Sequence, residues 1–109
     1  MASTIEAQGT TSTTISLTAN SGYTFSNITA FKNGTVLQVN FVLTSDTAIT
    51  AHSTIIVGKI NAPYTPKINA GSVSPSFRGV VATDGTIYLR SFSNVPAGSG
   101  ETVCFTILI

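Results

Sequence analysis

Alternation of apolar and polar residues at every second position runs through most of the chain, and no segment keeps a helical apolar period. Alternation is typical of strands with one face on a core, whereas helices repeat their apolar positions every three or four residues. The chain is therefore expected to be all-β. Strands are expected over residues 13–19, 24–32, 35–44, 54–60, 77–83, 86–92 and 102–109, with weaker extended segments at 47–51 and 66–69.

Turn-forming residues separate these segments: "NSG" at 20–22, "NG" at 33–34, "DG" at 84–85 and "PAGSG" at 96–100. The 18 Thr and 13 Ser residues agree with this pattern, because Thr favours strands and Ser favours turns. Many short strands with regular turns predict a small antiparallel β-barrel or a sandwich. Residues 11–109 are expected to form this one domain, and residues 1–10 a leader or the remnant of a preceding neck or linker.

The first predicted hairpin turns at Asn33-Gly34, a pair that suits a two-residue type I′ turn. This turn places Lys32 opposite Thr35 and Phe31 opposite Val36. The face expected to cover the core carries Ile28, Ala30, Leu37, Val39, Phe41 and Leu43. The other face carries Asn27, Thr29, Gln38 and Asn40, with Phe25, Phe31, Val36 and Val42 at its ends.

The second predicted hairpin turns at Asp84-Gly85 in the same way, with Thr83 opposite Thr86 and Ala82 opposite Ile87. Its core face is expected to hold Val80, Ala82, Ile87 and Leu89. Its opposite face is expected to hold Phe77, Val81, Tyr88, Arg90 and Phe92.

A solvated sheet face is normally polar, yet this opposite face is mostly apolar and aromatic. The last strand is similar, with Val103, Phe105, Ile107 and Ile109 on one side and Cys104 and Leu108 on the other. Sheets that are apolar on both faces need a cover on both. We therefore expect a homo-oligomer that buries the second face, with loops folded over that face as the alternative.

Charge is sparse, at 8% of residues with a net charge of +1, and the basic residues are scattered. Nucleic-acid binding needs a clustered basic patch, so no nucleic-acid partner is expected. Apolar runs are too short for membrane insertion. Cys104 is the single cysteine, so an internal disulfide is excluded, and it is expected to be a small buried apolar residue. One His and one Cys cannot form a zinc site within a chain, so no metal or cofactor is expected.

The carboxylates also give little support to catalysis, and the chain is not expected to be an enzyme. They are Glu6, Asp46, Asp84 and Glu101. Asp84 belongs to a turn, and exposed loop carboxylates mostly confer solubility. A glycosidase-like pair of Asp46 and Glu101 is the alternative.

The order of four segments resembles the C-terminal head domain of phage tail-fibre and baseplate receptor-binding proteins. These segments are "NGTVLQVNFVLT", "STIIVGKINAPYTPK", "FRGVVATDGTIYLRS" and "TVCFTILI", and the resemblance covers roughly residues 28–109. Tyr64 and Pro66 match the Tyr and Pro of the family's Leu-Pro-x-Gly-Tyr-x-Pro segment. The chain departs from that segment just before Tyr64, where it reads Ile60-Asn61-Ala62-Pro63.

The resemblance implies a small β-barrel or jelly roll that forms a homotrimer at the distal tip of a phage tail. Such a head recognises saccharide on the host cell wall or surface and joins other tail or baseplate proteins. A structural tail component that makes only protein contacts is one alternative. A monomeric bacterial carbohydrate-binding or adhesin module is another, and a polysaccharide hydrolase is the most distant.

Saccharide sites combine an aromatic platform with a few polar groups that fix orientation. The candidate ligand-binding residues are Tyr64, Arg78, Tyr88, Arg90, Phe92, His52 and Asp46. Tyr64, between two prolines, is expected either to anchor its segment or to stack on a sugar. His52 is expected to be either a polar residue at a strand start or one of three His52 side chains that meet on the axis of a trimer and bind a metal or an anion. Tyr88, Arg90 and Phe92 share a strand face that packs between protomers, contacts ligand, or does both in a groove between protomers.

Overall fold

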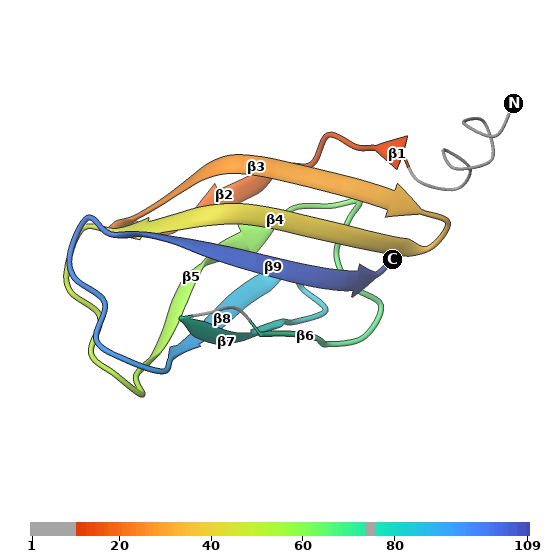
Figure 1. The fold of residues 1–109 in the computed structure, drawn as a ribbon. Coiled ribbons are helices and arrows are strands. Elements are labelled where there is room, and N and C mark those ends of the chain that lie inside the picture. Colours follow the sequence, from red (N-terminus) through yellow and green to blue (C-terminus); the bar gives the residue numbers. More distant parts are fainter. Residues whose placement is uncertain (1–10, 74–75) are drawn as a thin grey trace, which may run out of the picture.

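The fold is a sandwich of two antiparallel sheets, shown as two layers in the computed structural model of Figure 1, which describes residues 11–73 and 76–109. The four-stranded sheet has the order β1 (Thr11–Ser12), β3 (Tyr23–Asn33), β4 (Val36–Ser45), β9 (Gly100–Leu108). The five-stranded sheet has the order β2 (Leu17–Ala19), β5 (Thr54–Ile60), β8 (Thr86–Ser91), β7 (Phe77–Val81), β6 (Ala70–Val73). The predicted all-β class is confirmed.

The pairs β4–β9 and β5–β8 are nested, as in jelly-roll sandwiches, because the chain crosses between the sheets after β4 and again after β8. Both crossings lie at one end of the sandwich, where the backbone of Ile49 pairs with that of Val95. At the side of the sandwich, the Lys67 amide donates to the Leu108 carbonyl at 2.8 Å. Among the described residues there is no helix that is long and apolar enough to span a bilayer.

The core lies between the facing sheets and is filled by alternate side chains of β4, β5, β7, β8 and β9. An aromatic cluster occupies its centre: the ring centroids of Phe25 and Phe41 are 4.7 Å apart, and those of Phe41 and Phe105 are 6.2 Å apart. Val103, Phe105 and Ile107 are buried as expected. Cys104 is only half-buried on the outer side of β9, so its predicted full burial is wrong.

The first hairpin turns one residue later than predicted. Asn33 lies opposite Val36, and Gly34, with φ of +60°, takes the first turn position, which is the type II′ pattern. Lys32 therefore lies opposite Leu37 rather than Thr35. The pairing of β3 with β4 is therefore two residues away from the predicted register. Because side chains alternate every two residues, every side chain of β4 stays on its predicted face.

A β-bulge in β3 overturns two other expectations. The register of β3 against β4 shifts between Ser26 and Thr29, and Asn27 has a φ of +51°. A bulge puts the alternation of the residues before it out of phase with that of the residues after it. Phe25 consequently packs on the core and Ile28 is exposed, which is the reverse of the prediction.

The second hairpin has a three-residue turn, not the predicted two-residue turn. The Ala82 amide donates to the Thr86 carbonyl at 2.9 Å, and Gly85 has a φ of +93°. The Thr86 amide donates to Asp84 Oδ1 at 2.9 Å, and this bond holds the pKa of Asp84 below its usual value.

The extra turn residue inverts β7 relative to β8, because a shift of one residue moves every side chain to the other face. Phe77 and Val81 are buried, and Val80 is exposed. All three were expected on the opposite faces, and Ala82 is half-buried at the turn rather than in the core. The faces of β8 itself are as predicted, with Ile87 and Leu89 buried.

The predicted strand 13–19 is two strands in different sheets. Thr11–Ser12 pairs with β3, and Leu17–Ala19 pairs with β5. The intervening residues cross between the sheets although they contain no Gly or Pro to mark the crossing. The weak segment at 66–69 is wrong, since the strand there begins at Ala70, and 47–51 contributes only the Ile49 bridge. The expected leader, residues 1–10, lies outside the described residues.

Candidate functional site

The outer face of the five-stranded sheet carries two rows of side chains that run across β5, β8 and β7. In the first row Thr54 lies opposite Arg90, and Arg90 lies opposite Arg78. In the second row Ile56 lies opposite Tyr88, and Tyr88 lies opposite Val80. Side chains at directly opposite positions are neighbours, so the arginine row and the apolar row form one surface.

A hollow of about 240 Å³ opens on this surface, and we call it the β8 hollow. It is lined by Thr54, Arg78, Gly79, Val80, Tyr88, Leu89 and Arg90. Of the lining residues, Val80 exposes 40% of its surface and Tyr88 37%, and Ile56 beside the hollow exposes 47%. The hollow therefore presents an aromatic ring, an apolar border and two guanidinium groups to solvent.

Both arginines of the hollow lack an intrachain partner within the described part of the protein. Neither side chain forms an ion pair or a hydrogen bond there. Glu101, on β9 of the opposite sheet, accepts hydrogen bonds from the hydroxyls of Ser76 at 2.9 Å and Ser99 at 3.4 Å instead. Like charges at directly opposite sheet positions are destabilising. The pair thus costs stability that nothing in its own sheet offsets.

Replacing Arg90 with glutamate is expected to raise the free energy of unfolding by about 0.2–1 kcal/mol, because it turns a repulsive cross-strand pair into an attractive one. Urea unfolding of Arg90→Glu and wild type at equal protein concentration measures the difference. Lys67→Glu, which makes the same charge change outside the rows, is the control. A variant that is less stable than wild type would mean that the two guanidinium groups do not repel one another.

The remaining four expected site residues lie outside the β8 hollow. Phe92 follows β8, exposed, with its amide bonded to the Ser76 carbonyl at 3.0 Å. His52 has a φ of +64° in the loop before β5, and its amide donates to Ser91. Asp46 starts that same loop, where its amide donates to Gly22. The structure thus brings together Arg78, Tyr88 and Arg90 and separates them from the other residues.

Tyr64 lies at the other end of β5, in the loop that follows the strand. It is half-buried and packs against the core, while Pro66 beside it is buried. A hollow of about 310 Å³ adjoins it, lined by Lys32, Gly34, Thr35, Pro63, Tyr64 and Ile109. The packing of Tyr64 favours its anchoring role over direct contact with a sugar.

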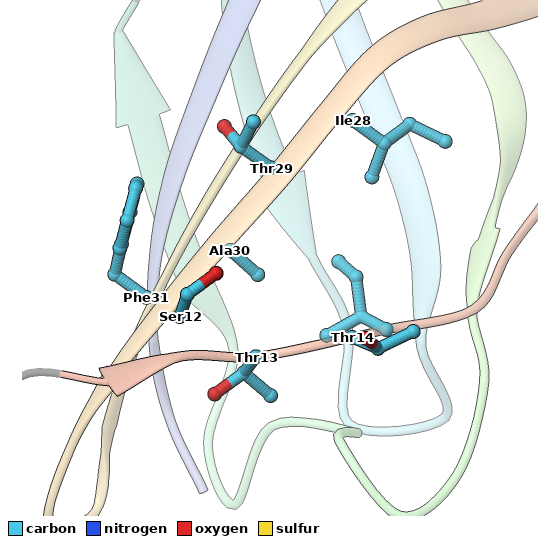
Figure 2. Close-up of a pocket in the computed structure, with 8 residues that line it drawn as sticks. Ser12, Thr13, Thr14, Ile28, Thr29, Ala30 and Phe31 are labelled. Atoms are coloured by element: carbon cyan, nitrogen blue, oxygen red, sulfur yellow. The ribbon is translucent and has the colours of Figure 1, made fainter.

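A third hollow, of about 300 Å³, lies between β3 and the segment that leaves β1 (Figure 2). Its walls are the hydroxyl and aliphatic side chains of residues 12–15 and 28–30, among them Thr13 and Ile28, together with the aromatic ring of Phe31. These walls carry no charged group that would orient a ligand. Within the described residues there is also no group of three His, Cys, Asp or Glu residues that could hold a metal ion.

The sequence pattern missed Val80, Ile56 and Thr54 as parts of the site. Val80 was assigned to the core because the "ATDGT" turn was read with two loop residues. A three-residue turn ending in Gly is the signal that would have placed Val80 beside Tyr88. Thr54 lines the hollow and Ile56 lies beside it only because β5 pairs with β8, and that pairing joins segments far apart in the sequence.

No protein-family model matches the chain, and no curated protein matches it in sequence. Two solved structures are similar to it, both of the fibre head domain of the Atadenovirus snake adenovirus 1. In one crystal form the match covers 89% of this chain and 90% of the other, with a TM-score of 0.45 and 14% identity. In the second it covers 91% and 94%, with a TM-score of 0.47 and 14% identity. Both scores are below 0.5, so the fold is assigned from the strand order and registers of this chain.

Proposed function

We propose that this chain is a non-enzymatic receptor-binding head domain of a phage tail fibre or baseplate, and that it binds saccharide on the host cell surface. The observation that carries the proposal is the β8 hollow, where Tyr88 lies beside two arginines that have no intrachain partner in the described residues. A ring face packs against the C–H side of a sugar, and guanidinium groups donate hydrogen bonds to its oxygens.

Two of the four segments that resemble phage head domains supply the strands that build this surface. "FRGVVATDGTIYLRS" forms β7 and β8, and "STIIVGKI" forms β5. "TVCFTILI" forms most of β9 on the opposite sheet. Two of the four resembling segments therefore carry the exposed site, and the other two belong to the opposite sheet. On this proposal the domain lies at the distal end of the virion tail.

The proposal includes a homotrimer in which the outer face of β8 adjoins the neighbouring protomer. Phe92 is exposed at the end of β8 although it is large and apolar. A contact through Phe92 leaves the β8 hollow at the junction between protomers. The three hollows of one trimer would act together on a repeating surface polymer, so a weak affinity at each single site is enough for tight binding of the trimer.

Phe92→Ala is expected to shift the protein from trimer to monomer at low micromolar concentration, because an exposed apolar side chain contributes to assembly rather than to its own core. Light scattering on a sizing column gives the mass, and thermal melting checks the fold. Tyr88→Ala is expected to have the same effect if the contact extends over the hollow. An unchanged trimeric mass in both variants would refute the β8 interface.

Binding to intact bacteria and to a glycan array tests the function. The labelled domain is expected to stain cells of a subset of strains and to bind specific glycans. Failure on both would contradict receptor binding. Tight co-purification with another tail protein without glycan binding would favour a purely structural tail component, and a monomeric mass with glycan binding would favour a stand-alone carbohydrate-binding module.

A further inference from the structure

We infer that the β8 hollow selects acidic saccharides, with the anionic group of the ligand bound between Arg78 and Arg90. This inference rests on the proposed function and narrows its ligand class. Two of the five Lys and Arg residues of the chain lie directly opposite each other across β7 and β8.

Only 8% of the residues are charged, so the composition does not force two arginines into opposite positions. An anion between the two guanidinium groups adds two attractions that outweigh their mutual repulsion. Neither group has an ion-pair partner in the described residues, so no existing ion pair has to be broken before the anion binds. The site is thus already arranged for an anion.

The side-chain type also favours an oxyanion. A guanidinium presents its donors in a planar fork that matches two oxygens of a carboxylate or a phosphate, whereas a lysine ammonium acts as a point charge. The hydroxyl of Thr54, opposite Arg90, extends the same row with a further donor. The arginine row therefore offers donors along its length and no acceptor with a negative charge.

The apolar row explains why the anion belongs to a saccharide. Tyr88 is two residues from Arg90 on the same strand face, about 7 Å along the strand at ~3.4 Å per residue. Ile56 and Val80 lie opposite Tyr88 on the two neighbouring strands and extend the apolar surface on both sides of it. A sugar ring packed on Tyr88 places its acidic substituent, or that of the next unit, over the arginines.

A nucleic acid fits this surface less well. Its phosphate backbone needs a track of cations, and binding strengthens with each phosphate that is neutralised. The other three basic residues, Lys32, Lys59 and Lys67, lie outside the two rows. Two arginines and one tyrosine suit a single anionic group beside a single ring.

The test uses pairs of glycans that differ only in charge. Oligogalacturonate and its methyl ester form the carboxylate pair, and phosphorylated and unphosphorylated mannan oligosaccharides form the phosphate pair. The array carries further acidic glycans, such as sialylated and sulfated chains, with their neutral counterparts. The full chain is applied as wild type, Arg78→Gln, Arg90→Gln and Lys67→Gln, the last being a matched loss of one charge outside the site.

Wild type is expected to bind acidic glycans and not their neutral counterparts. Each arginine variant is expected to bind at least about tenfold more weakly, since a hydrogen bond to a charged group is lost, and Lys67→Gln is expected to bind like wild type. Arg90→Lys is expected to bind acidic glycans more tightly than Arg90→Gln but less tightly than wild type. Carboxylate and phosphate pairs show which anion the site prefers. Sizing-column masses of all variants confirm that assembly is unchanged.

Binding to neutral glycans that is equal in wild type and both arginine variants would overturn the inference and leave the proposed function standing. If no glycan binds, titration with inorganic phosphate, followed through the Nε–H signals of the arginines, separates the two claims. Shifts at Arg78 and Arg90 that are absent with chloride would support an anion site and contradict saccharide binding. No shift would overturn both.

Discussion

Replacing Gly85 with alanine is expected to lower the free energy of unfolding by about 3 kcal/mol or more. The φ of +93° costs an L-residue about 1–2 kcal/mol, and overpacking adds about 1–3 kcal/mol. The overpacking is severe because a Cβ at Gly85 would lie 2.1 Å from the Ile60 carbonyl oxygen, which is backbone and cannot rotate away. Gly85→Val should be worse still. Urea unfolding measures the loss.

Gly98→Ala is the matched control for this prediction. Its φ of +77° is similar, but a Cβ there would meet nothing within 4 Å. The control is therefore expected to lose only about 1–2 kcal/mol. Equal losses in the two variants would show that the close approach of the turn to β5 is not what requires Gly85.

Phe41→Ala is expected to cost about 3–5 kcal/mol, which is the usual range for removing a buried phenylalanine. Phe41 is 1% exposed and lies between Phe25 and Phe105 in the centre of the sandwich. Removing its ring leaves a cavity that strands from both sheets must close. Chemical unfolding at fixed protein concentration gives the difference from wild type.

Phe31→Ala tests whether position in the sandwich decides this cost. Phe31 is the same residue type on the neighbouring strand, but it is 41% exposed on the outer face. Its loss is expected to stay below about 1 kcal/mol in the folded protomer, as at most surface sites. A loss as large as that of Phe41→Ala would contradict the assignment of inner and outer faces.

The strand content could be predicted because alternation is a local signal. The boundaries of β4, β5 and β9 lie within two residues of the expected ones, and the predicted core face of β4 is confirmed. Bulges and turn lengths were harder, because both depend on backbone geometry that a one-residue pattern does not report. Asn27 and Gly85 show this: each has a positive φ, and each marks a point where a face was assigned wrongly.

The crossing between β1 and β2 could not be predicted for a different reason. Ile15 and Leu17 continue the alternation of the preceding residues, so the sequence pattern predicts one strand. Both side chains pack against the core although β1 and β2 belong to different sheets. A chain that crosses at the sandwich edge keeps its alternation while it changes partner, and only the pairing shows the change.

The candidate site was predictable in part. Tyr88 and Arg90 share a strand face by alternation alone, and that prediction is confirmed. Arg78 joins them through the register of β7, which the sequence pattern gave one residue out. That Tyr64, His52 and Asp46 lie elsewhere depends on the path of the loops around both ends of β5, which no local pattern encodes.

The most direct test of the account is to map where a bound glycan contacts the domain, by backbone amide chemical shifts with a glycan selected on the array. The account predicts the largest shifts at Thr54, Arg78, Tyr88 and Arg90, on the outer face of the five-stranded sheet. Shifts confined to the 46–53 loop or to the segment around Tyr64 would contradict it, because they would place saccharide binding away from the β8 hollow.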